Sequence, residues 1–157
     1  MTASDDDIRA KTLQVATAYL TLMGDWDAWT DLWAEDGVLE FPYAPKGRQK
    51  AYSGRAEIRD YMIAASGKMA MVAPPRMRMH PALDPGVLSV ELTIDGKATA
   101  TGALFTQSYV MVFEVKDGKL WRLREYWNPL VNIAAFANGD VEAWASKFGK
   151  PEPVAAA

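Results

Sequence analysis

The chain has 157 residues, of which 50% are hydrophobic and 24% charged, and its formal net charge is −3. These values are typical of a globular domain with its own core, and they exclude a disordered chain or a protein with a concentrated basic face for nucleic acid. The absence of cysteine excludes disulfides, zinc–thiolate sites and cysteine nucleophiles.

No apolar run approaches the roughly 20 residues that a bilayer span needs. The N-terminal sequence MTASDDD is acidic, unlike a secretory or mitochondrial presequence. We therefore expect a cytoplasmic protein without a membrane partner, folded as one domain over residues 1–157 with a flexible tail at 149–157.

The N-terminal half predicts helices. In the first, apolar residues recur at intervals of three and four behind the capping residue Ser4 or Asp5. The second carries a stripe of tryptophans that includes Trp29 and Trp33. The three helices are expected at residues 4–22, 25–37 and 54–67, with a strand at 38–43 and a loop at 44–54.

After Pro74 the apolar pattern alternates, which predicts an antiparallel meander of strands. Turn signals at Asp84–Gly86, Asp95–Gly96 and Asp117–Gly118 separate the strands. The strands are expected at 76–82, 86–94, 99–115 and 119–128, followed by helical segments at 130–137 and 141–148. Helices followed by a curved antiparallel sheet form an α+β cone with a pocket at its mouth.

The last strand, in KLWRLREYWNP, contains a carboxylate in an apolar row. Trp121, Leu123, Glu125 and Trp127 fall on alternate positions and so share one face. Pairing Lys116 with Lys119 across the turn places Glu125 opposite Val110. The interior face is then expected to comprise Ser108, Val110, Val112, Leu123, Glu125 and Trp127.

A buried Glu125 would have a raised pKa and could both accept and return a proton. Alternatively, it forms an internal ion pair or stays hydrated at the mouth. Tyr61, on the inward side of the third helix, is a candidate donor to a ligand carbonyl or phenolate; the alternative is a hydroxyl bonded to a backbone carbonyl.

Aromatic side chains are the expected walls of the pocket, although the tryptophan stripe is also typical of a core. The residues expected to bind ligand are Trp29, Trp33, Phe41, Tyr43, Ser108, Val110 and Trp127. His80 is the single histidine, and a lone histidine is a poor basis for a metal site, so neither a metal nor a cofactor is expected.

The opposite sheet face is expected to be rich in aromatic residues and arginine, as subunit interfaces are. It comprises Gln107, Tyr109, Met111, Phe113, Arg122, Arg124 and Tyr126. We expect a homodimer through this outer face, the alternative being coverage by the chain's own C-terminal segment.

The phrases LWAEDGVLEFP, YSGRAEIRDY and VKDGKLWRLREYWNP resemble the SnoaL-like branch of the NTF2-like superfamily, and in particular the phenazine-biosynthesis A/B (PhzA/PhzB-like) proteins. The resemblance implies an α+β cone, a dimer formed through the sheets, and a deep pocket for a small ring-containing molecule. The glutamate of that motif is an acid/base in the phenazine proteins, a role carried over to Glu125. Tyr61 stands where those proteins have a histidine, and tryptophans stand where they have a basic residue, which implies a less polar ligand.

The expected function is therefore a cofactor-independent acid/base enzyme of isomerase, dehydratase or cyclase type, acting on a small apolar ring-containing molecule. Glu125 and Tyr61 are its candidate catalytic residues. The alternative is a non-catalytic small-molecule-binding or accessory protein of the same fold.

Overall fold

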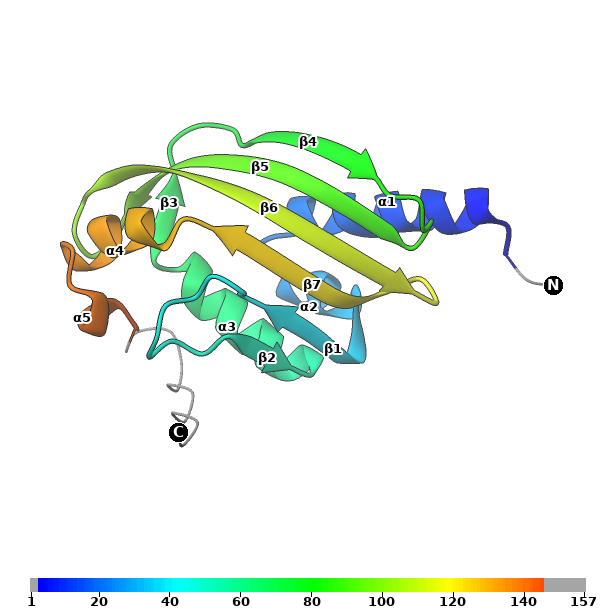
Figure 1. Ribbon diagram of the computed structural model, residues 1–157, viewed down its shortest axis with the longest axis horizontal. Coiled ribbons are helices and arrows are strands. Elements are labelled where there is room, and N and C mark those ends of the chain that lie inside the picture. The colour runs from blue at the N-terminus through cyan, green and yellow to red at the C-terminus, as the bar shows by residue number, and fades with distance from the viewer. Residues whose placement is uncertain (1–2, 146–157) are drawn as a thin grey trace.

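The structure is a computed structural model that describes residues 3–145, and it consists of helices packed on a curved seven-stranded sheet (Figure 1). The elements are α1 (Asp5–Thr21), α2 (Trp26–Asp31), β1 (Trp33–Glu40), β2 (Ala51–Ser53), α3 (Arg55–Ser66), β3 (Met69–Met71), β4 (Arg76–Pro81), β5 (Val87–Ala98), β6 (Leu104–Lys116), β7 (Lys119–Trp127), α4 (Pro129–Ala137) and α5 (Val141–Ala145). The predicted α+β class is confirmed. The end of the helical segment expected at 141–148 and the tail at 149–157 lie outside the described residues.

The strand order is β2-β1-β7-β6-β5-β3, and β4 also pairs with β5. Strands β4 to β7 form the antiparallel meander that the sequence predicts, whereas β1 runs parallel to β7. The sequence pattern missed β2 and β3, since strands of three residues are too short to show alternation. Helices α1, α2 and α3 lie behind the sheet in Figure 1, and α4 and α5 lie at one end of it.

Helix α1 lies within one residue of the predicted bounds at each end, and it has a complete capping box. The Ser4 hydroxyl accepts a hydrogen bond from the Asp7 amide, and the Asp7 carboxylate accepts one from the Ser4 amide, both at 3.2 Å. The buried face of the helix includes Val15 and Tyr19. This face directs Tyr19 toward the inner side of the sheet.

The second helix is shorter than predicted. It ends at Asp31, and Trp33 already belongs to β1, so the expected helix over 25–37 was wrong in its second half. The backbone explains the change, because the Leu120 amide of β7 donates to the Leu32 carbonyl at 2.8 Å and draws the chain into the sheet. Trp29 and Trp33 nevertheless stay in contact, with ring centroids 5.9 Å apart.

The turn expected at Asp95–Gly96 was also wrong, since β5 continues through it to Ala98. Gly96 serves a different purpose there: the Phe105 ring lies over it, and a Cβ would stand 2.6 Å from Phe105 Cζ. A glycine in a strand often marks such a close approach. The turn lies instead after Ala98, where Gly102 has a φ of +74°.

The register of β6 and β7 contains a β-bulge that the sequence did not reveal. Lys116 pairs with Lys119 as predicted, but the register shifts between Val115 and Glu114, which leaves Trp121 as the extra residue. Glu125 therefore lies opposite Met111, and the predicted pairing with Val110 was wrong.

The bulge exchanges the two faces of β6 relative to β7, because side chains alternate with a period of two. The predictions that Ser108, Val110 and Val112 face inward, and that Gln107, Tyr109, Met111 and Phe113 face outward, were wrong. Trp121 is also half exposed rather than part of the inner row. On β7 the assignment is confirmed, with Leu123, Glu125 and Trp127 inside and Arg122, Arg124 and Tyr126 outside.

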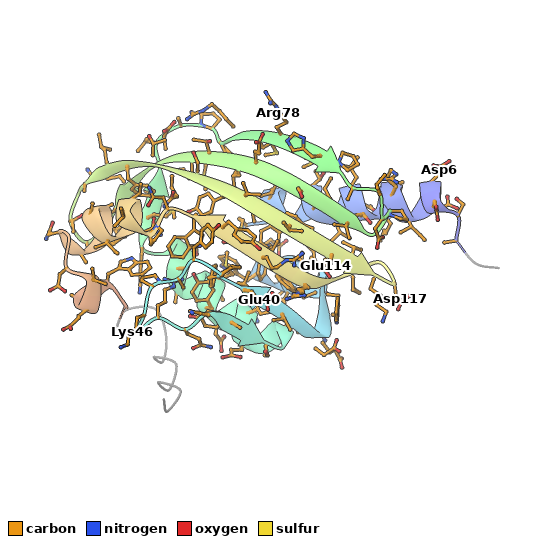
Figure 2. The ribbon with its side chains drawn as sticks, in the orientation of Figure 1. Asp6, Glu40, Lys46, Arg78, Glu114 and Asp117 are labelled. Carbon is orange, nitrogen blue, oxygen red and sulfur yellow. The ribbon has the colours of Figure 1, made fainter. Side chains whose placement is uncertain are left out.

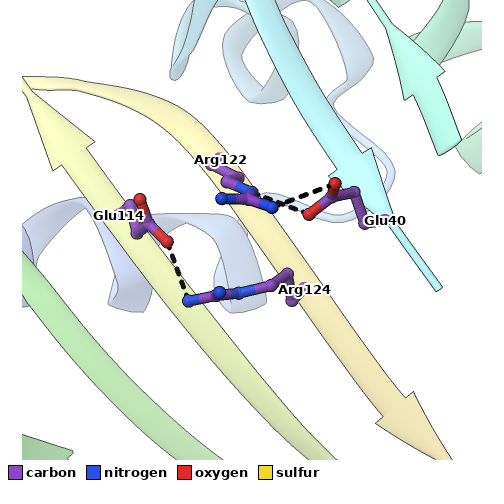
Figure 3. A network of polar contacts seen from close by, with 4 residues as sticks. All are labelled: Glu40, Glu114, Arg122 and Arg124. Atoms are coloured by element: carbon purple, nitrogen blue, oxygen red, sulfur yellow. Dashed lines mark hydrogen bonds and ion pairs between the residues drawn. The ribbon is translucent and has the colours of Figure 1, made fainter. Parts of the chain in front are cut away.

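Ion pairs on the outer face tie neighbouring strands together (Figure 3). The Arg122 guanidinium donates to both oxygens of Glu40 on β1, at 2.7 and 3.1 Å. Arg124 donates to Glu114 on β6 at 2.8 Å. Other charged side chains, such as Arg78 and Lys46, extend from the periphery of the molecule (Figure 2).

Gly37 offers a test of this packing. A Cβ at this position would lie 2.8 Å from Trp33 Cε3 and 3.1 Å from the Ala34 carbonyl oxygen. Gly37→Ala should therefore lower the free energy of unfolding by about 1–3 kcal/mol, measured by urea denaturation. Gly67→Ala is the matched control, because its Cβ would meet nothing closer than 3.6 Å, and it should leave stability unchanged or slightly raised. Equal effects of the two substitutions would contradict this packing.

Candidate active site

A cavity of about 320 Å³ lies between the inner face of the sheet and helices α1, α3 and α4. Its volume is near the lower end of the range for small-molecule sites, which suits a ligand of one or two fused rings. Its lining is mostly apolar. The polar side chains among its lining residues are Tyr19, Arg48, Tyr61, Ser66, Tyr109, Glu125 and Asn132.

Glu125 lies in this cavity and is 9% exposed. The Tyr19 hydroxyl donates to Glu125 Oε1 at 3.1 Å, and in the described part of the chain the second carboxylate oxygen has no hydrogen-bond donor. Burial raises the pKa of Glu125 to about 7, against the opposing effects of the Tyr19 hydrogen bond and the Arg48 charge. At neutral pH the carboxyl group is therefore populated in both protonation states.

Aromatic packing holds Tyr19 in place behind Glu125. Its ring lies 5.2 Å from that of Trp29, 6.2 Å from that of Trp33 and 5.4 Å from that of Phe113. The Trp29 indole N–H also donates to the Tyr19 carbonyl at 3.2 Å. These contacts give the tryptophan stripe a supporting role beneath the cavity.

Tyr61 extends from α3 into the same cavity. Its ring stacks on Tyr52 with a centroid separation of 4.2 Å, and Arg48 Nη2 donates to its hydroxyl oxygen at 2.7 Å. Burial raises the pKa of Tyr61, while the Arg48 charge lowers it. Tyr61 is thus a neutral phenol at physiological pH, bonded to a guanidinium rather than to the backbone carbonyl considered above.

Two further polar groups face the cavity from β6 and α4. The Tyr109 hydroxyl has no hydrogen bond to any described residue, and burial followed by the Glu125 charge raises the pKa of Tyr109. Gln107 Nε2 donates to Asn132 Oδ1 at 2.8 Å and to the Asn128 carbonyl at 2.7 Å. This contact fixes the Asn132 side chain with its carbonyl toward Gln107.

Thioethers form much of the remaining lining. Of the chain's 8 methionines, 6 line the cavity. They are Met23, Met62, Met69, Met71, Met77 and Met111. Met23, Met71 and Met77 are each 44–50% exposed, so they form the rim, and their flexible side chains can adapt to ligands of different outline.

Four of the nine residues named from the sequence line this cavity: Phe41, Tyr61, Glu125 and Trp127. Five do not. Trp29 and Trp33 are fully buried beneath it, so the expectation that they contact the ligand lacks a geometric basis. Tyr43, Ser108 and Val110 instead line an open groove on the outer face. The register shift turns Ser108 and Val110 outward, and Tyr43 lies in the loop between β1 and β2.

Sequence reasoning missed Tyr19, Arg48, Tyr109 and Asn132. Tyr19 could have been predicted, because it lies on the inward face of the first helix and its hydroxyl could reach a group inside the cavity. Tyr109 would have followed from the correct register. Arg48 lies in the loop between β1 and β2, where no periodicity indicates a direction. His80 pairs with Glu91 at 3.2 Å on an exposed surface, outside the cavity.

Among residues 3–145, no group of three or more acidic, histidine or cysteine side chains is arranged to hold a metal ion. None of the described helices is long and apolar enough to cross a membrane. The polar groups that line the cavity are carboxyl, phenol, hydroxyl, amide and guanidinium groups.

Comparison with known proteins assigns a family to the chain. Residues 17–123 match the family model of the SnoaL-like domain. The Bacillus subtilis protein YesE is 38% identical over 126 residues, which are 80% of this chain and 85% of that protein. The PhzA/B-like protein PA3332 of Pseudomonas aeruginosa is 35% identical over 138 residues, or 88% of this chain and 96% of that protein.

Among solved structures, that of a candidate isomerase from Bacillus subtilis superimposes with a TM-score of 0.73 at 35% identity, over 88% of this chain and 98% of that one. The family match covers more than half of the chain, and both relatives are similar along most of their length. The predicted resemblance is confirmed, and the chain belongs to the SnoaL-like family of the NTF2-like superfamily.

Proposed function

We propose that the protein is a cofactor-independent acid/base enzyme that moves a proton on a small, mostly apolar ring compound held in the cavity. The observation that carries the proposal is the buried Glu125 carboxyl, whose pKa is raised to about 7 and which lines a cavity of ligand size. A group with a pKa near the working pH is suited to accept and return a proton.

The remaining groups support the same chemistry. The Tyr61 hydroxyl can donate to a ring oxygen, which stabilises the negative charge that develops when a neighbouring carbon loses its proton. Glu125 would take that proton and return it to another atom, which is an isomerisation, or to a leaving hydroxyl, which is a dehydration. The naming of a relative at 35% identity as a candidate isomerase is consistent with the first of these.

Proton exchange at carbon provides the direct test. The bicyclic ketone 1-tetralone matches the cavity in size and polarity, and in deuterium oxide its α-protons exchange visibly by NMR. The wild type should accelerate this exchange, and Glu125→Gln, which keeps shape but cannot take a proton, should reduce the rate by at least about 100-fold. The affinity for the ketone should change little.

The rate should also depend on pH in a defined direction. The proton acceptor is the carboxylate, so exchange should rise with pH, pass its midpoint near the pKa of about 7 and level off above it. A midpoint at the ordinary carboxyl value of 4.5 would contradict a desolvated Glu125. Tight binding of a panel of cyclic ketones without Glu125-dependent exchange would favour the alternative, a non-catalytic binding protein.

The raised pKa also predicts an effect on stability. Between its ordinary value of 4.5 and about 7, Glu125 holds its proton in the folded state but loses it in the unfolded state. The folded state therefore loses stability as pH rises through this window, by about 3 kcal/mol in total. Glu125→Gln should abolish this loss and be more stable than the wild type at pH 8 but not at pH 4.5, as measured by urea denaturation at both pH values. Equal stability of the two proteins at pH 8 would argue against a buried carboxylate.

We also propose that the protein forms a homodimer through the outer sheet face. The groove on this face is lined by Tyr43, Ser108, Val110 and Tyr126, and the flanking arginines are neutralised by Glu40 and Glu114. Val110 is 44% exposed on β6, and a two-fold axis over this strand would bury it against its own copy.

The dimer can be tested with a matched pair of substitutions. Val110→Glu would bury two carboxylates in the interface and should give a monomer in size-exclusion chromatography with light scattering. Val141→Glu is the control, since Val141 is also 44% exposed but lies on α5, and it should remain dimeric. A monomeric wild type, or a dimeric Val110→Glu variant, would contradict this interface. The cytoplasmic location expected from the sequence remains a prediction.

A further inference from the structure

Arg48 is a buried cation that the proposed chemistry has not yet used. It is 2% exposed, although it lies on a loop. Its guanidinium carbon stands 4.8–5.2 Å from the ring centroids of Phe41, Trp127 and Trp144, and Nη2 donates to the Tyr61 oxygen at 2.7 Å. Contacts with aromatic faces offset part of the cost of burying the charge and fix the orientation of the side chain.

The contact with Tyr61 has a definite polarity. A guanidinium has N–H donors and no acceptor, so the Tyr61 oxygen must be the acceptor in this hydrogen bond. The hydroxyl hydrogen of Tyr61 is then directed away from Arg48, and Tyr61 lines the cavity. A hydroxyl that accepts from a cation is also a stronger donor, because hydrogen bonds in a chain polarise one another.

We propose that Arg48 is a positioning residue that holds Tyr61 as a strengthened hydrogen-bond donor for a ring oxygen gaining negative charge, which makes cyclic ketones and their enol or phenol tautomers the substrate class. This inference deepens the proposed function and rests on the same cavity. Tyr109 lines the same cavity and offers a second hydroxyl donor there. Tyr61 touches the substrate, whereas Arg48 acts through Tyr61.

Binding of 2-naphthol tests the oxygen site without any turnover. The experiment uses the Glu125→Gln protein, in which no carboxylate repels an ionised naphthol. The matched ligand 2-methylnaphthalene has nearly the same shape and lacks the oxygen. In this background, Tyr61→Phe should weaken 2-naphthol binding by about tenfold, because the hydrogen bond from the Tyr61 hydroxyl to the naphthol oxygen is lost. Binding of 2-methylnaphthalene should change by less than about twofold.

A double-mutant cycle then separates a positioning role from a structural one. Arg48→Met should weaken 2-naphthol binding several-fold, and the double variant Arg48→Met, Tyr61→Phe should be no weaker than Tyr61→Phe alone. The absorption spectrum supplies a second readout: bound 2-naphthol should ionise at lower pH than free 2-naphthol, and this shift should shrink in either single variant. Arg48→Lys, which keeps a cationic donor, should restore part of it.

Additive losses in the double variant, or an equal loss of affinity for 2-methylnaphthalene, would overturn the inference. If Arg48→Met does not fold, the Tyr61→Phe comparison and the ionisation of bound 2-naphthol still decide it.

The inference and the proposed function can be refuted independently of each other. If Tyr61 gives no preference for 2-naphthol over 2-methylnaphthalene but the Glu125-dependent exchange of 1-tetralone is observed, the oxygen site alone is refuted. If that preference is observed but the exchange is not, the acid/base function alone is refuted.

Discussion

The desolvation of one carboxyl group is the constraint on which the candidate site depends. Glu125 has no cationic hydrogen-bond partner among the described residues, and a phenol, Tyr19, is its hydrogen-bond donor. A direct ion pair with arginine would have held its pKa low and removed it from acid/base chemistry at neutral pH. The Arg48 charge lowers the pKa of Glu125 through space, while Arg48 Nη2 donates a hydrogen bond to Tyr61. Because Arg48 and Glu125 do not form a direct hydrogen-bonded pair, the Glu125 carboxyl keeps a raised pKa and can titrate near neutral pH.

A β-bulge in β7 and the parallel pairing of β1 with β7 determine which side chains surround Glu125. The bulge at Trp121 lets both Leu120 and Leu123 point into the core, each 0% exposed, and it brings Tyr109 and Met111 to the same face as Glu125. The parallel pairing of β1 with β7 brings Phe41 and the Arg48 loop beside Trp127. Segments distant in sequence thus contribute to one cavity because of strand register.

The sequence predicted those parts of the structure that depend on local patterns. The capped first helix, the meander, the Asp117–Gly118 turn and the inward position of Glu125 all follow from periodicity and turn chemistry. The end of the second helix and the faces of β6 could not be predicted in this way. Their outcome depends on a long-range strand pairing at Leu32 and on a single unpaired residue, and a one-residue shift moves every side chain of a strand to the other face. Arg48 was unpredictable for a related reason, since a loop residue acquires its direction only from tertiary contacts.

The polar residues and the exposed methionines of the cavity differ in rigidity, and this difference has a consequence for specificity. Tyr19, Tyr61 and Asn132 are each fixed by a hydrogen bond or a stacked ring. At the rim, half-exposed methionines have several accessible rotamers and a polarisable sulfur. Fixed polar groups discriminate strongly, because a ligand that lacks the matching oxygen leaves buried donors unpaired, whereas an apolar wall discriminates weakly between rings of similar size. Selection at this site should therefore act on the position of one oxygen, and the outline of the rest of the molecule should matter less.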